Sequence, residues 1–196
     1  VNSTLAYQKQ DVEQAYKILK ECEELFGTHP QSYGHFISLA RFSYELNKID
    51  EARSYTAKAK SIKSYGTEIF INEGFFAIID ENENEIYRNY SELSKTYKHD
   101  IEQINYTDII SWLENQKGKL NSDLLEFATG FYSFCYCEEK LGRKIFKNLK
   151  TDEFKKSYPM IHQLVIKLLL KGTTKPVYYF RDKKNTKKRQ KKKRKK

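Results

Sequence analysis

The chain has few of the residues that interrupt helices, form disulfides or cross membranes. Three Pro and eight Gly occur among its 196 residues, so helices are seldom interrupted. Its three cysteines, Cys22, Cys135 and Cys137, are an odd number in a long chain. A disulfide framework is therefore not expected, and reduced thiols favour a cytoplasmic compartment. The best apolar run, residues 164–170, contains Lys167 and is far too short to span a bilayer.

The sequence also lacks the spacings that are typical of catalytic and metal centres. Cys135 and Cys137 would point in nearly opposite directions on a helix, so they do not form a ligand pair. No Gly-rich phosphate loop and no nucleophile motif is present. The histidines are scattered along the chain, without an acidic or cysteine neighbour at ligand spacing: His29, His35, His99 and His162. We therefore expect a protein that is not an enzyme and that has no cofactor or metal site.

An excess of positive charge lies at the C-terminus. Residues 183–196 hold eleven Lys or Arg and no acid, whereas residues 1–182 hold 25 basic and 26 acidic residues. Dense like charge without apolar side chains predicts a disordered segment. The basic residues of this tail are candidates for binding a polyanion: Lys183, Lys184, Lys187, Lys188, Arg189, Lys191, Lys192, Lys193, Arg194, Lys195 and Lys196.

Several roles remain open for the basic tail. Lysine and arginine on a flexible chain bind RNA or DNA by displacing counterions, and without aromatic residues for base stacking such binding would not depend on sequence. A nuclear import signal would fit a eukaryotic source. Attraction to anionic lipid lacks an anchor motif, and a solubilising end is the simplest alternative. If the tail binds a polyanion, the affinity should disappear when residues 183–196 are removed.

Residues 36–59 read as two short helices joined by a tight turn, and their pattern recurs downstream at a fixed offset of 34. Recurrence at this period indicates a helical repeat array, because each hairpin buries its apolar face against the next one. Small residues such as Ala40 and Ala52 let two helices approach closely. The recurring pairs are Phe36 and Phe70, Ala40 and Gly74, Ala52 and Ile86, Thr56 and Tyr90, and Ala59 and Leu93.

This pattern resembles the tetratricopeptide repeat, a helical hairpin of about 34 residues. The first copy carries Phe36, Leu39, Ala40 and Ala59, together with the triplet Asp50-Glu51-Ala52, and the resemblance covers about residues 5–100. In the second copy Glu73 and Ile86 depart from the usual residues. The resemblance implies an all-α fold in which antiparallel hairpins stack as a right-handed superhelix. It also implies an interaction module rather than a catalyst.

The apolar periodicity predicts helices over residues 11–26, 32–46, 49–61, 67–80, 83–97, 106–120, 123–141 and 154–171. Asp11 is expected to cap the first helix, Asn121-Ser122 to form a capping break, and Gly142 and Gly172 to stop helices. Four regions follow: repeats over 1–100, divergent repeats or a capping bundle over 101–173, an extended piece over 174–182, and the tail over 183–196. The first repeat is incomplete, so we expect a C-terminal part of a longer protein; an array that begins with half a repeat is the alternative.

The first helix of each hairpin supplies the candidate partner groove. Helical spacing and the offset of 34 place seven side chains together on its open side, and this mixture of apolar residues with one arginine suits a peptide or a helix. The groove residues are Ile37, Arg41, Tyr44, Ile71, Asn72, Phe75 and Ile78. The alternative is that they pack the next helix. A lysine for gripping a terminal carboxylate is missing, because Ile37 and Ile71 occupy its expected positions.

Three functions are compatible with these features. The first is an adaptor or sensor module that binds a protein or peptide partner. The second is a protein associated with nucleic acid, in which the array positions the basic tail. The third is the C-terminal sensing region of a larger multidomain signalling or defence ATPase.

Overall fold

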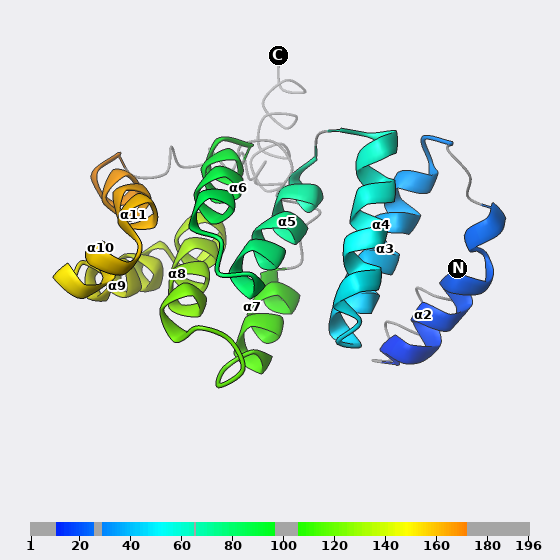
Figure 1. Ribbon diagram of the computed structural model, residues 1–196, viewed down its shortest axis with the longest axis horizontal. Coiled ribbons are helices and arrows are strands. Elements are labelled where there is room, and N and C mark those ends of the chain that lie inside the picture. The colour runs from blue at the N-terminus through cyan, green and yellow to red at the C-terminus, as the bar shows by residue number, and fades with distance from the viewer. Residues whose placement is uncertain (1–10, 26–28, 65, 97–105, 172–196) are drawn as a thin grey trace, which may run out of the picture.

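The computed structural model describes residues 11–25, 29–64, 66–96 and 106–171, and within these ranges the protein is all-helical, without strands. The helices stand side by side in a row, from α2 at one end to α9–α11 at the other (Figure 1). Residues 174–196, and with them the predicted extended piece and basic tail, lie outside the described part. The elements are α2 (Val12–Glu21), η1 (Glu23–Leu25), α3 (Ser32–Glu45), α4 (Ile49–Ile62), α5 (Thr67–Ile79), α6 (Glu83–Thr96), α7 (Tyr106–Asn115), α8 (Ser122–Tyr132), η3 (Ser133–Cys137), α9 (Glu139–Asn148), α10 (Asp152–Ser157) and α11 (Pro159–Lys171).

Two successive hairpins, α3–α4 and α5–α6, turn in the same way. Asn47 and Glu81, which correspond at the offset of 34, both have a positive φ, of 58° and 50°. This left-handed residue reverses the chain at the end of the first helix and lets the next amide bond back to it. The closing bonds recur at the same offset: Lys48 N to Ser43 O (2.8 Å), and Asn82 N to Ala77 O (2.9 Å).

The residues that recur at an offset of 34 form the buried faces of these hairpins. Phe70 is half-buried, and all the other recurring residues are buried. At Gly74, an added Cβ would lie only 3.0 Å from Cε2 of Tyr90. The absence of a side chain at this position therefore lets α5 and α6 approach closely, as the pattern of small residues predicts.

Two predicted helix starts are confirmed by their caps. The Asp11 carboxylate accepts a hydrogen bond from the Gln14 amide at 2.9 Å and caps α2. The Asn121 carboxamide accepts from the amides of Asp123 (3.1 Å) and Leu124 (3.3 Å) and caps α8. Each bond satisfies amides that the first turn of a helix leaves without a partner.

The prediction of one helix over residues 123–141 is wrong. The α-helix α8 ends at Tyr132, a π-helical segment follows, and α9 begins at Glu139. Gly142 does not stop a helix but lies inside α9. An added Cβ there would lie 2.3 Å from the backbone nitrogen of Phe134. The glycine is thus a contact point between two backbones, which a sequence pattern for helix ends cannot distinguish from a stop.

Two further boundaries differ from the prediction. The helix predicted over 154–171 is divided at Tyr158 into α10 and α11, because the residue before a proline, here Pro159, disfavours helical geometry. Glu83 then caps α11 from the start of α6: its Oε1 accepts the amides of Met160 (2.6 Å) and Ile161 (3.2 Å). Helix α7 ends at Asn115, before the predicted position, and Gly118, with φ +77°, lies in the turn that follows.

The interior consists of two hydrophobic clusters that meet within the α3–α4 hairpin. The smaller cluster joins α2, α3 and α4 through Ala15, Tyr16, Phe36, Leu39, Ala40, Phe42, Tyr55 and Ala59. The larger cluster extends from Tyr44 and Ala52 through α5–α11 and includes Leu124, Phe127, Ala128 and Phe131 of α8 and Ile161, Leu164 and Leu168 of α11. The hairpin α3–α4 therefore connects a small N-terminal unit to the main core.

Candidate functional site

Most of the predicted groove residues lie in the interior. Tyr44, Ile71, Asn72, Phe75 and Ile78 are each at most 7% exposed. The hypothesis that these five side chains line an open groove is therefore corrected: all five are buried against other helices of the chain, and of the five only Tyr44 borders a cleft.

Tyr44 is the centre of this packing. Its ring stacks on Phe76 (5.0 Å between centroids) and meets Phe75 and Trp112 edge-on, at 5.9 Å and 5.6 Å. Tyr44 is related by the offset of 34 to Ile78 in α5, and Ile78 is related by the same offset to Trp112 in α7. The first helices of three successive hairpins thus contribute equivalent positions to one contact region.

The other predicted groove residues separate into buried and half-exposed positions. Asn72 donates from Nδ2 to Thr56 Oγ1 at 3.1 Å, which satisfies both polar groups inside the protein. Ile37 is half-buried against the smaller cluster. Arg41 is half-exposed and pairs with Glu45 at 3.2 Å. Ile37 and Arg41 are therefore the only two of the seven that reach the surface to a substantial extent.

A cleft of about 410 Å³ opens beside Tyr44, between α2, α3 and α7. Two aromatic rings, Tyr44 and Trp112, form part of its wall, and three carboxamides and a hydroxyl lie beside them. The buried Nε1 of Trp112 has no hydrogen-bond partner among the described residues. The complete lining is Val12, Tyr44, Glu45, Asn47, Ser111, Trp112, Asn115, Gln116 and Lys119.

Sequence reasoning identified only Tyr44 in this cleft. It missed the α7 residues because the recurring pairs end at Leu93 and α7 begins 39 residues after α5. Helix α6 begins at Glu83 and α8 begins at Ser122, an offset of 39 rather than 34. Trp112 could have been identified from the sequence by continuing the offset of 34 from Ile78.

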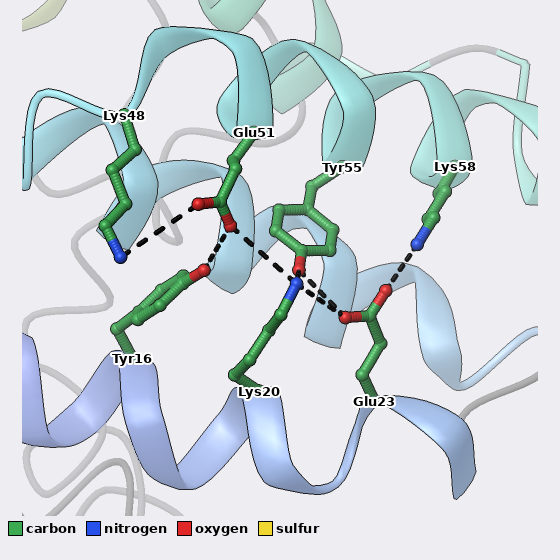
Figure 2. A network of polar contacts seen from close by, with 7 residues as sticks. All are labelled: Tyr16, Lys20, Glu23, Lys48, Glu51, Tyr55 and Lys58. Atoms are coloured by element: carbon green, nitrogen blue, oxygen red, sulfur yellow. Dashed lines mark hydrogen bonds and ion pairs between the residues drawn. The ribbon is translucent and has the colours of Figure 1, made fainter.

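A network of polar side chains joins α2 and η1 to α4 (Figure 2). The Tyr16 hydroxyl donates to Glu51, and Lys20 donates to the Tyr55 hydroxyl. Tyr55 in turn donates to Glu23 at 2.8 Å. Lys58 also donates to Glu23. Three contacts of the network join residues that are 35 apart in the sequence: Tyr16 to Glu51, Lys20 to Tyr55 and Lys58 to Glu23. The network therefore connects the second helices of adjacent units.

The charges of this network shift the protonation equilibria of its members. Burial alone would raise the pKa of the Glu23 carboxyl, but hydrogen bonds from Lys58, Lys20 and Tyr55 outweigh burial and lower the pKa to about 2. Burial, and then the hydrogen bond to Glu51, raises the pKa of the Tyr16 hydroxyl. At neutral pH the Glu23 carboxylate is therefore charged and the Tyr16 hydroxyl is protonated, and their hydrogen bonds join α2 and η1 to α4.

A second cleft, of about 370 Å³, lies between α4, α5 and α6. Its cations are paired: Arg53 with Asp80 at 2.7 Å, and Lys60 with Glu73. Arg88 contacts Glu73 at 3.7 Å and also pairs with Glu85. Equal numbers of paired opposite charges give this cleft no preference for an anion or a cation.

The described ranges show no arrangement that indicates redox or metal chemistry. Burial raises the pKa of the Cys135 thiol, which disfavours the reactive thiolate. No group of three or more His, Cys, Asp or Glu within the described residues is placed to hold a metal ion. In the same part of the chain, no helix has the length and apolar character needed to cross a membrane.

Comparison with protein-family models, with curated proteins and with solved structures found no match for this chain.

Proposed function

We propose that this chain is a non-catalytic interaction module of the tetratricopeptide type, whose hairpins stack as a superhelix and hold a peptide or helix of a protein partner in the cleft between α2, α3 and α7. The repeated turn geometry at Asn47 and Glu81 supports the repeat, since both its φ values and its hydrogen bonds recur at the same offset. The cleft supports the binding role.

The observation that carries this proposal is the composition of the cleft wall. The mostly buried rings of Tyr44 and Trp112 border the cleft with their exposed edges, and Asn47, Asn115 and Gln116 offer carboxamides beside them. Carboxamides both donate and accept hydrogen bonds, so they match the alternating groups of a peptide main chain. Aromatic surface next to such groups is typical of protein-binding sites, where the ring buries apolar area and polar groups set orientation.

The test uses two double variants on the same turn. Asn115→Ala/Gln116→Ala removes two cleft carboxamides from side chains that are exposed and half-exposed, so the fold should persist. Glu114→Ala/Lys117→Ala is the control, because this pair bonds to itself and does not line the cleft. Peptides selected from a displayed random library on the wild-type chain should bind the first variant at least about tenfold weaker, a loss of about 1.4 kcal/mol. Equal binding by both variants, or a library that yields no binder, would contradict the proposal.

The basic tail favours a second candidate function, association with RNA or DNA. Its eleven Lys or Arg residues without an acid give strong, salt-dependent and sequence-independent attraction to phosphates. Titration of labelled RNA and duplex DNA at several salt concentrations tests this function, with the wild-type chain and with a chain whose tail cations are replaced by Gln. A wild-type chain without affinity at low salt would exclude it.

A further inference from the structure

The net charge of residues 1–182 is almost zero, but its positive and negative charges are distributed unequally along the chain. Residues 1–138 hold 14 basic and 22 acidic residues, and residues 139–171 hold nine basic and three acidic residues. The sum over residues 1–182 conceals this division. The helices α9, α10 and α11 are therefore strongly basic on their own, in addition to the tail.

The lysines of this C-terminal end lack carboxylate partners. Cations of the preceding hairpins such as Lys20, Lys58 and Lys60 are paired with glutamates. Among the described residues of α9–α11 and the loops between them, Arg143 pairs with Glu139 at 2.9 Å, and the exposed lysines have no ion pair. These lysines are Lys140, Lys144, Lys147, Lys150, Lys155, Lys156 and Lys167.

Three of these lysines lie on one face of α9. Lys140, Lys144 and Lys147 follow one another at i, i+4 and i+7, so they form one stripe along α9, opposite the buried Phe146. Neighbours in the stripe are about 4.5–6 Å apart along the helix axis. This spacing suits a polymer whose negative charges repeat over a similar distance.

A second group of lysines gathers around α11. Burial, and then the charges of Lys155 and Lys150, lowers the pKa of His162. Lys155 of α10 and Lys150 of the loop before it therefore lie close enough to α11 to act on the His162 side chain. The nearby acid is Asp152, which opposes their effect only in part.

This end of the row is also the end from which the tail continues. Helix α11 ends at Lys171, beside α9 and α10 in Figure 1. Eleven residues separate it from Lys183, and a chain of that length reaches at most about 40 Å. The cations of the tail can therefore engage the same polymer as the cations of α9–α11.

We propose that α9–α11 form a folded basic surface that binds the phosphate backbone of RNA or DNA. This inference rests on the second candidate function and is independent of peptide binding in the cleft. Nucleic acid is favoured over a lipid surface because the lysines of α9 follow a line, and because the tail that continues from this surface has no apolar residue to insert into a bilayer. Lysine acts as a point charge, so binding should be independent of sequence. The expectation that all polyanion affinity resides in the tail is thereby revised.

The test compares two full-length double variants that remove the same charge. Lys150→Gln/Lys155→Gln lies on the proposed surface, and Lys17→Gln/Lys63→Gln lies on exposed positions of the N-terminal half. Binding of a labelled RNA hairpin and a DNA duplex is measured over a series of salt concentrations. The first variant should lower the slope of log affinity against log salt by about 1.4–1.8, that is, about 0.7–0.9 for each lost phosphate contact. The control should keep the wild-type slope, and equal slopes for the two variants would overturn the proposal.

A chain with its tail cations replaced by Gln separates the folded surface from the tail. This chain should keep a weaker affinity at low salt, and adding Lys150→Gln/Lys155→Gln should reduce that affinity further. If no affinity is left after the tail is neutralised, the folded surface is excluded while nucleic-acid binding by the tail stands. Binding to vesicles of anionic phospholipid without binding to either nucleic acid would also overturn the proposal.

Discussion

The hydroxyl of Tyr44 donates a hydrogen bond to the backbone carbonyl of Asn72, with 2.8 Å between the two oxygens. This bond ties α3 to α5 inside the protein, at the point where the sequence predicted an open groove. Burial raises the pKa of Tyr44 well above its ordinary value, so the hydroxyl remains a donor at any pH at which the protein is stable.

Tyr44→Phe should lower the free energy of unfolding by about 1–2 kcal/mol, because a buried hydrogen bond is lost while the ring remains. Urea denaturation followed by circular dichroism measures the change. Arg41→Ala serves as the comparison, since its i, i+4 pair with Glu45 is partly exposed and such a pair contributes about 0.5 kcal/mol. A Tyr44→Phe protein as stable as wild type would show that the bond is absent in solution.

The double variant Tyr44→Ala/Phe75→Ala distinguishes a core position from a groove position. Each substitution removes a buried aromatic ring, at a cost of about 3–5 kcal/mol, and small domains have only about 5–15 kcal/mol in total. We expect the variant to lose most of its helical circular dichroism at room temperature. A fully helical double variant would restore the open-groove hypothesis.

Two glycines should respond to alanine in opposite directions. Gly142→Ala should lower the free energy of unfolding by about 1–3 kcal/mol or more, because the new methyl group meets the backbone of Phe134. At Gly34, in the first turn of α3, an added Cβ meets nothing within 4 Å, so Gly34→Ala should stabilise the protein by up to about 1 kcal/mol. Thermal melts of both variants test the pair, and an unchanged melting temperature for Gly142→Ala would contradict the contact with Phe134.

Acid should weaken the attachment of α2 through Glu23. The pKa of this carboxyl is about 2 in the folded protein against an ordinary value of 4.5. A lowered folded-state pKa gives stability that is complete above about pH 4.5 and is lost as the pH falls toward about 2. Glu23→Gln should therefore lower the melting temperature at pH 6 and have little effect near pH 2.

The control for this pH dependence is Glu21→Gln, on an exposed position at the end of α2. It should have a small effect at every pH. If Glu23→Gln and Glu21→Gln behave alike at pH 6, the network in Figure 2 does not stabilise the folded state.

Most of the helices are predictable from the sequence because they depend on local patterns. Apolar stripes and the period of 34 locate α3–α6, and the capping residues Asp11 and Asn121 locate two helix starts. The period works because each hairpin repeats the same contacts with its neighbour. The break before α9 has no such signal, since residues 133–141 contain neither Gly nor Pro.

The cleft and the charged surfaces are less predictable because they depend on which elements meet. Helical phase places Tyr44 toward the open side of one hairpin, but it does not show that Trp112 covers the ring. In the same way, charged residues from separate helices, such as Glu23 and Lys58, read as a solvated face until α2 and α4 are placed together. The net charge of residues 1–182 likewise does not reveal that residues 139–171 are basic.

The capping of α11 by Glu83 sets an order in which the chain can fold during its synthesis. The carboxylate and the amide of Met160 that it accepts are 77 residues apart. At about 5–20 residues per second, a ribosome needs roughly 4–15 s to make the intervening chain. Helices α3 to α6 emerge before α11, and the contacts within each of their hairpins are local. These hairpins therefore have time to form during translation, whereas the face of α6 that α11 covers stays uncovered until α11 has been made.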